Sequence, residues 1–140
     1  MTHAEQLENL IDIVIKENAS DLHLSEGRHP SVRVSGFLIP LIKMPVLTHE
    51  DTKGLLQELV SKDLVSRFEA EKELDFSYAY KDKIRFRGNA FIQQGKVSVA
   101  LRLIPKIIKT LEELKLPPIL GTFADKQQGF FLVVGPVGQG

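Results

Sequence analysis

The sequence of 140 residues contains no cysteine and no tryptophan. The lack of cysteine excludes disulfide bonds, cysteine-ligated zinc sites and thiol catalysis. The formal net charge is zero, with 18 Lys and Arg against 18 Asp and Glu, and this argues against a dedicated nucleic-acid-binding protein, which would usually be basic. No apolar run reaches the roughly 20 residues that a membrane-spanning helix needs, so we expect no transmembrane segment. The N-terminus carries acids where a signal peptide would carry basic residues.

What the sequence does contain is typical of a folded domain. Hydrophobic residues make up 43% and charged residues 26% of the chain, as in ordinary soluble globular proteins. The length predicts one domain, or one domain and a fragment of another. A chain of this size buries roughly two-thirds of its unfolded surface, so a hydrophobic core can form without covalent links.

Three threonines are each followed, three residues later, by an acidic residue, and this capping-box form predicts helix starts. They are Thr2, Thr48 and Thr110. The first helix is expected over residues 2–16, where apolar residues recur at the spacing of one buried face. The second helical region restarts at Ser61, and Pro117 and Pro118 interrupt the third.

Period-two alternation and turn residues predict an antiparallel sheet. The expected strands cover residues 22–24, 31–35, 37–39, 74–80, 84–92 and 97–104. Residues 129–134 are continuously apolar and predict a last strand, of the kind that is buried on both faces in a parallel sheet. The helices and strands do not alternate strictly, so we predict an α+β fold with helices on one side of the sheet.

Charge is unevenly distributed along the chain. Residues 48–75 carry eight acids and four basic residues, whereas residues 81–109 carry eight basic residues and one acid. If Gln94 and Gly95 form the turn between the two basic strands, the register places Arg87 directly opposite Arg102. Opposed like charges destabilise a sheet, which predicts an anion or a carboxylate between them. The alternative is a solvated polar face whose arginines pair with nearby acids.

The C-terminal residues have the glycine spacing of a phosphate-binding loop. They are Gly135, Pro136, Val137, Gly138, Gln139 and Gly140. Such a loop follows a buried strand, reads GxxxxGK[ST] and cradles phosphates with backbone N–H groups. The Lys and Ser/Thr would be the next two residues. The alternative is a glycine-rich tail.

Several segments together resemble the twitching-motility (PilT-like) ATPases that retract type IV pili. They are residues 19–25 (ASDLHLS), 73–78 (ELDFSY), 85–91 (RFRGNAF), Arg102, 110–117 (TLEELKLP) and 135–140. The resemblance covers nearly the whole chain. Ser25 and Glu26 favour the retraction branch over the secretion and pilus-assembly ATPases, and Gly88 stands where the family pattern leads us to expect valine.

The resemblance implies a PAS-like N-terminal domain over residues 1–104, a linker over 105–110, and the start of a RecA-like ATPase core over 111–140. It implies that Arg87 and Arg102 contact the phosphates of ATP, with Arg85 as a further nucleotide-binding candidate and residues 135–140 as a partial Walker A loop. ATP and Mg²⁺ are expected cofactors of the full-length protein. The chain by itself lacks the Walker lysine, so we expect neither hydrolysis nor a tightly bound nucleotide.

The resemblance further implies a homo-hexamer in the cytoplasm, peripheral to the inner membrane, that acts on the inner-membrane platform protein of the type IV pilus and binds no nucleic acid. Two other functions remain open. One is a stand-alone PAS-like sensory or protein-interaction module. The other is a type II secretion or pilus-assembly ATPase of the same superfamily. We expect no metal site, a structural role for His23, and a turn or interface role for Asp21.

Overall fold

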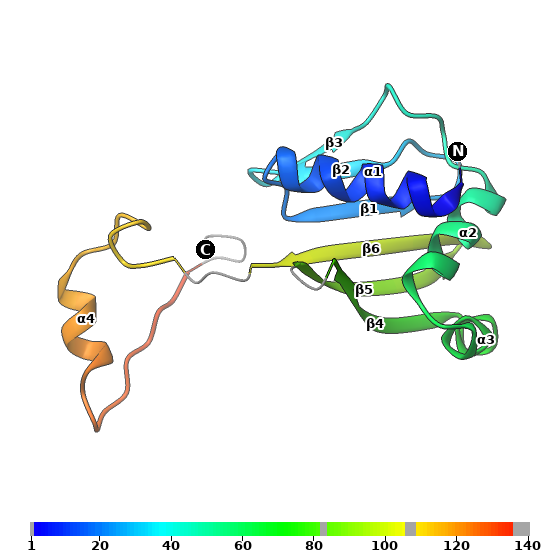
Figure 1. The fold of residues 1–140 in the computed structure, drawn as a ribbon. Coiled ribbons are helices and arrows are strands. Elements are labelled where there is room, and N and C mark those ends of the chain that lie inside the picture. The colour runs from blue at the N-terminus through cyan, green and yellow to red at the C-terminus, as the bar shows by residue number, and fades with distance from the viewer. Residues whose placement is uncertain (1, 82–83, 106–108, 136–140) are drawn as a thin grey trace. The chain divides into compact units, whose positions relative to one another are not determined.

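The computed structural model describes residues 2–81, 84–105 and 109–135. The chain divides into two compact units, Met1–Lys106 and Ile107–Gly140. Figure 1 shows the helices and strands of each unit. In chain order they are α1 (His3–Lys16), β1 (Asp21–Ser25), β2 (Ser31–Val34), β3 (Phe37–Pro40), α2 (His49–Leu59), α3 (Lys62–Glu71), β4 (Glu73–Tyr80), β5 (Ile84–Gln93), β6 (Lys96–Ile104) and α4 (Ile119–Ala124).

The first unit contains one six-stranded sheet in the order β3-β2-β1-β6-β5-β4. All neighbouring strands are antiparallel. The N-terminal strands β1–β3 and the later strands β4–β6 join where β1 pairs with β6. This pairing brings together residues about 80 positions apart in sequence, such as Asp21 and Arg102. The predicted α+β fold with an antiparallel sheet and flanking helices is confirmed.

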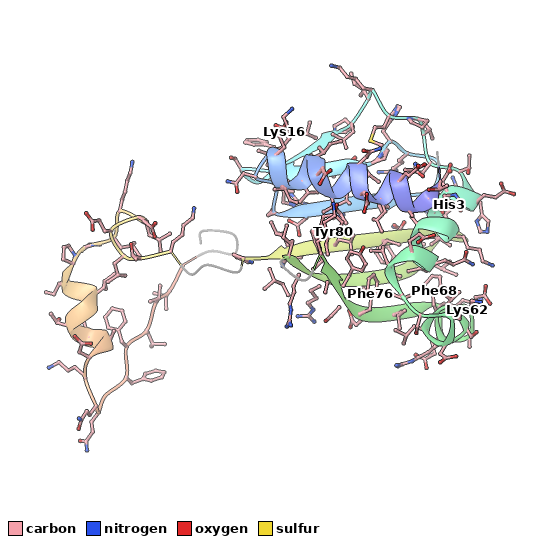
Figure 2. The ribbon with its side chains drawn as sticks, in the orientation of Figure 1. His3, Lys16, Lys62, Phe68, Phe76 and Tyr80 are labelled. Carbon is pink, nitrogen blue, oxygen red and sulfur yellow. The ribbon has the colours of Figure 1, made fainter. Side chains whose placement is uncertain are left out.

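The helices pack on one face of the sheet and bury its apolar residues. Helix α1 contacts β1, α2 contacts β6, and α3 contacts β4. Phe68 of α3 and Phe76 of β4, both labelled in Figure 2, belong to the same core cluster. Phe86 and Leu101 are fully buried in it. Because side chains alternate along a strand, residues of the other parity lie on the opposite face.

Two of the three predicted helix starts begin regular helices with capping boxes. The Thr2 backbone N–H donates to Glu5 Oε2 at 2.7 Å, and the Thr48 backbone N–H donates to Asp51 Oδ2 at 2.8 Å. In each box the threonine side chain accepts a hydrogen bond from the backbone N–H of the acidic residue. Such a cap satisfies N–H groups that have no partner within the helix.

The turn between β5 and β6 has the predicted residues. Gln94 and Gly95 both have positive φ angles, of 52° and 77°, as a two-residue type I′ turn requires. Gln93 consequently pairs with Lys96, and the register continues to Arg87 opposite Arg102. The predicted cross-strand arginine pair is therefore confirmed.

The second unit differs from the sequence prediction. Residues 129–134 form no strand, and they are exposed, so the prediction of a buried strand there is wrong. A strand needs the backbone of a neighbouring strand, and among its described residues, 109–135, the second unit contains no other strand. Thr110 and Glu113 do make the predicted capping hydrogen bonds, but only turns follow, and the helix α4 begins after Pro118.

Candidate functional site

The face of the sheet opposite the helices carries a row of charged residues from four neighbouring strands. Arg33 of β2, Asp21 of β1, Arg102 of β6 and Arg87 of β5 pair consecutively across the strands. Ser77 of β4 continues the row beside Arg87. Three arginines and one aspartate thus lie side by side. Neither Asp21 nor Arg33 was expected to belong to the site.

Asp21 is the buried centre of this row and is only 6% exposed. Arg102 Nε donates to its Oδ1 at 2.9 Å, and Ser20 Oγ donates to its Oδ2 at 2.7 Å. Arg33 Nε lies 3.4 Å from the same Oδ2. Burial alone would raise the pKa of the Asp21 carboxyl, but the hydrogen bonds from Ser20 and Arg102 and the charge of Arg102 hold this pKa below its ordinary value. The carboxylate is therefore ionised and bonded at both oxygens.

Arg102 and Arg87 differ in their partners. The side chain of Arg102 is 74% exposed and is held through Nε, so its terminal nitrogens remain accessible. Arg87 is exposed, and its side chain makes no hydrogen bond or ion pair with any other residue that the structure describes. The expected carboxylate is present, but it lies beyond Arg102 on β1 and not between the two arginines. Pairing with a nearby acid thus accounts for Arg102, whereas no described residue supplies a counter-charge to Arg87.

The remaining candidate residues do not extend the row. Arg85 is exposed and lies two residues before Arg87 on β5, on the same face of the sheet. Its neighbours across the strands are Ala79 and Ile104. Gly135 belongs to the second unit, in a segment without regular structure. Five residues of the predicted phosphate-binding loop lie outside the described part of the chain. They are Pro136, Val137, Gly138, Gln139 and Gly140.

His23 follows Asp21 on the same face of β1, as a strand residue. Its Nε2 atom is buried and has no hydrogen-bond partner among the described residues. Burial lowers the pKa of the imidazole, the charge of Asp21 partly opposes this shift, and the charges of Arg33 and Arg102 add to it. His23 is therefore neutral near pH 7. Among the residues described, no cluster of His, Asp and Glu could hold a metal ion.

The same face becomes acidic toward one edge. Glu73 and Asp75 of β4 lie beside Asn89 of β5, whose Nδ2 donates to Asp75 Oδ1 at 3.1 Å. The arginine row and this acidic edge occupy different positions on one surface. The positive charge of the hairpin is therefore concentrated locally, which favours binding of an anion at the row.

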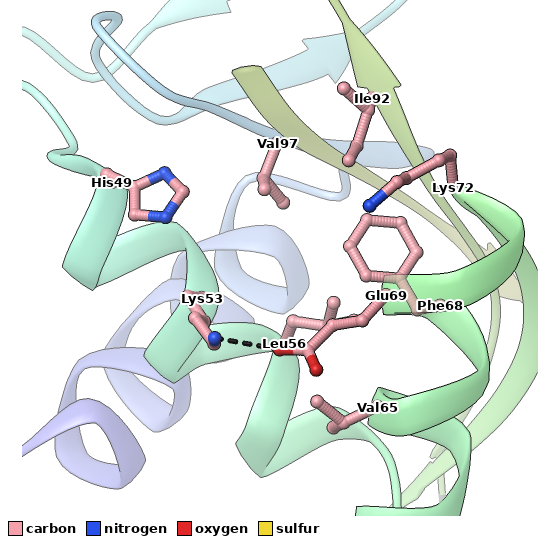
Figure 3. A pocket seen from close by; sticks show the side chains of 9 residues that line it. All are labelled: His49, Lys53, Leu56, Val65, Phe68, Glu69, Lys72, Ile92 and Val97. Carbon is pink, nitrogen blue, oxygen red and sulfur yellow. Dashed lines mark hydrogen bonds and ion pairs between the residues drawn. The ribbon is translucent and has the colours of Figure 1, made fainter. Parts of the chain in front are cut away.

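A largely apolar hollow lies on the face of the sheet that the helices cover. Its volume is about 180 Å³. Figure 3 shows it between α2, α3 and the ends of β5 and β6. Its floor includes Leu56 and Phe68, and the ammonium of Lys53 at its rim is paired with Glu69 Oε1 at 2.8 Å. Lys72 also lines the hollow, but an apolar floor suits the packing of apolar groups better than phosphate binding.

A second hollow, of about 360 Å³, is polar and lies at the tip of the β5–β6 hairpin. Arg28 and Lys96 line it together with serine and glutamine side chains. It lies away from the arginine row. Neither hollow contains Arg87 or Arg102.

Comparisons with known proteins agree with the resemblance seen in the sequence. No family model matches the chain. The chain is 36% identical to the type IV pilus retraction ATPase PilT of Pseudomonas aeruginosa over 94% of its own length, and 35% identical to the type IV pilus ATPase PilU of the same organism over 96%. It spans only 38% and 35% of the length of these two proteins.

Solved structures give the same relationship. A crystal structure of the pilus retraction motor PilT with bound ADP superposes with a TM-score of 0.73 at 37% identity, covering 94% of this chain and 38% of that one. The ATPase DotB of Legionella pneumophila gives a TM-score of 0.77 at 20% identity, covering 92% of this chain and 37% of DotB, which shows a shared fold alone. No described helix is both long enough and apolar enough to span a bilayer. In sequence and in fold, the chain is a homologue of part of the type IV pilus ATPase PilT.

Proposed function

We propose that the chain is the N-terminal part of a hexameric motor ATPase that powers type IV pilus retraction, and that Arg87 and Arg102 contact the phosphates of bound ATP. In this proposal residues 1–104 form a PAS-like domain and residues 105–110 a linker. Residues 111–140 begin a RecA-like core, with a partial Walker A loop over 135–140. The homology to PilT and the ADP found in its crystal structure support nucleotide binding by the longer protein.

The observation that carries the proposal is Arg87, which lies directly opposite Arg102 and has no ion pair with a residue in the described ranges. Two guanidinium groups at this spacing repel each other, and a bound anion removes that repulsion. The planar guanidinium grips phosphate oxygens with two parallel hydrogen bonds. In phosphoryl transfer, an arginine that reaches the γ-phosphate stabilises the charge of the transition state. A domain that swings such arginines onto ATP would couple the nucleotide state to movement.

The proposed setting is the cytoplasm at the inner-membrane face, with Mg²⁺ as the metal of the nucleotide and the pilus platform protein as the partner. Retraction is preferred over secretion because the identity to PilT is 36%, whereas the likeness to DotB is at the level of fold. The longer protein that carries this chain is expected to restore twitching when it is expressed in a strain that lacks its own retraction ATPase. Restoration of pilus assembly without retraction would contradict this preference.

The test of the arginines uses the longer protein that carries this segment. Arg87→Ala and Arg102→Ala are each expected to lower kcat for ATP hydrolysis at least about tenfold, since such arginines contribute large factors to phosphoryl transfer, and to raise KM for ATP, since they also contact the phosphates in the ground state. The matched control is Arg67→Ala in α3, an exposed arginine that pairs with Glu71 and is expected to hydrolyse ATP at the parental rate. Parental rates in both Arg87→Ala and Arg102→Ala would refute the phosphate-contact role.

A further inference from the structure

We propose that Asp21 is a positioning residue for the phosphate site, with Arg33 as the counter-charge that lets it act. This inference rests on the proposed function, because it explains how Arg102 is made ready for a phosphate. It concerns residues that the sequence prediction left outside the site. The ligand class is an oligophosphate, such as the phosphate chain of a nucleoside triphosphate.

Asp21 holds Arg102 by the inner nitrogen of its guanidinium group. Asp21 Oδ1 accepts a hydrogen bond from Arg102 Nε at 2.9 Å. Nε is the guanidinium nitrogen nearest the backbone. This contact fixes the plane of the group and leaves its outer nitrogens exposed, consistent with a side chain that is 74% exposed. A free arginine has several rotatable bonds to order when it binds a ligand, and holding it beforehand reduces that entropic cost.

Asp21 does not cancel the positive charge around Arg102, because a second arginine also pairs with it. A lone carboxylate beside Arg102 would cancel its charge and repel a phosphate. Asp21 is instead shared, because Arg33 Nε lies 3.4 Å from Oδ2 while Arg102 bonds Oδ1. Two guanidinium groups on one carboxylate leave one net positive charge. Arg33 Nη1 also donates a hydrogen bond to the Gly36 carbonyl in the β2–β3 turn at 3.0 Å, and this second contact fixes the Arg33 side chain beside Asp21.

The carboxylate of Asp21 is itself fixed in orientation. Asp21 is 6% exposed, and Ser20 Oγ donates to Oδ2 at 2.7 Å. A buried carboxylate with both oxygens bonded keeps one orientation. No described residue holds the guanidinium group of Arg87 in the way that Asp21 holds that of Arg102. The two arginines of the site therefore differ, in that Asp21 holds Arg102 in advance.

The test is a double-mutant cycle in the longer protein, measured as steady-state ATP hydrolysis. Asp21→Asn is expected to raise KM for ATP about threefold to tenfold, the size of a weakened charge-assisted hydrogen bond, with a smaller change in kcat. Because Asp21 acts through Arg102, the same substitution is expected to have no further effect on KM in an Arg102→Ala background. In an Arg87→Ala background it is expected to keep its full effect.

The matched control is Asp75→Asn, an exposed aspartate on the same face that accepts from Asn89, and parental kinetics are expected. Arg33→Gln is a second variant that leaves Asp21 in place, and it is expected to raise KM in the same Arg102-dependent manner. An equal effect of Asp21→Asn in the Arg102→Ala and Arg87→Ala backgrounds would overturn the positioning role. That outcome is distinct from failure of the proposed function, in which neither arginine variant changes ATP hydrolysis at all.

Discussion

The two units of the chain place similar apolar residues in opposite environments. In the first unit, apolar residues alternate along β4, β5 and β6, and those of one parity are buried beneath the helices, as Phe86 and Leu101 are. In the second unit, five apolar residues follow one another, and each is more than half exposed. They are Phe130, Phe131, Leu132, Val133 and Val134. Hydrophobicity alone therefore does not bury a segment; it needs a surface on which to pack.

The difference follows from what a strand requires. Each strand of the first unit has at least one antiparallel neighbour that satisfies its backbone groups. Residues 129–134 have no such neighbour among the described residues of their own unit. A continuously apolar run is typical of a strand with neighbours and helices on both faces. The contrast between a packed unit and an unpacked segment can be tested with single substitutions.

The largest expected effect is in the core of the first unit. Phe86→Ala removes a fully buried ring and is expected to lower the free energy of unfolding by about 3–5 kcal/mol. Urea denaturation followed by circular dichroism measures this. Phe131→Ala is the control in the second unit, where this residue is 52% exposed, and a much smaller loss is expected. Similar losses in the two variants would contradict the difference between the packed first unit and the exposed segment of the second.

The next effect concerns close packing within the sheet. A Cβ atom at Gly88 would overlap the ring of Phe76, its partner on β4, and this explains why glycine stands where the pattern of the resembling family leads us to expect valine. Gly88→Val is expected to cost about 1–3 kcal/mol of unfolding free energy. The double variant Gly88→Val with Phe76→Ala is expected to be more stable than the sum of the two single losses predicts, because removing the ring makes room. Additive losses would show that the two side chains do not compete for space.

A smaller effect is expected from pH. Because burial lowers the pKa of His23, the unfolded chain binds a proton there at a higher pH than the folded chain does. Stability is therefore complete above the unfolded pKa of about 6.5 and falls as pH decreases through the lower folded pKa. Thermal unfolding of the parent and of His23→Gln between pH 7.5 and 5 tests this over roughly the range in which histidine titrates. The variant is expected to lose less stability, and parallel pH profiles would exclude His23 as the source.

The smallest effect is expected from removal of the second unit. The core cluster of the first unit consists entirely of residues between Leu7 and Leu103. A chain ending at Lys106 is therefore expected to unfold with a free energy within about 0.5 kcal/mol of that of the corresponding transition in the whole chain. Denaturant titration of both chains compares these values. A loss of several kcal/mol would show that the first unit depends on residues 107–140.

The part of the candidate site that was predictable is the part with local causes. Arg87 and Arg102 face each other because Gln94 and Gly95 favour a two-residue turn, and that turn fixes the register of the whole hairpin. Alternation then assigns the arginines to the face opposite the apolar residues. The contribution of Asp21 was not predictable in this way, because it depends on the pairing of β1 with β6, about 80 residues away.

The sequence by itself determined the helix starts at Thr2 and Thr48, the hairpin turn and the arginine pair, because each depends on interactions among residues close in the chain. Only the tertiary structure decided the strand order, the row from Arg33 through Asp21 to Arg102, and the exposure of residues 130–134. Strand order and burial depend on contacts between distant segments. A local pattern shows what a segment can pair with, but not which segment it meets.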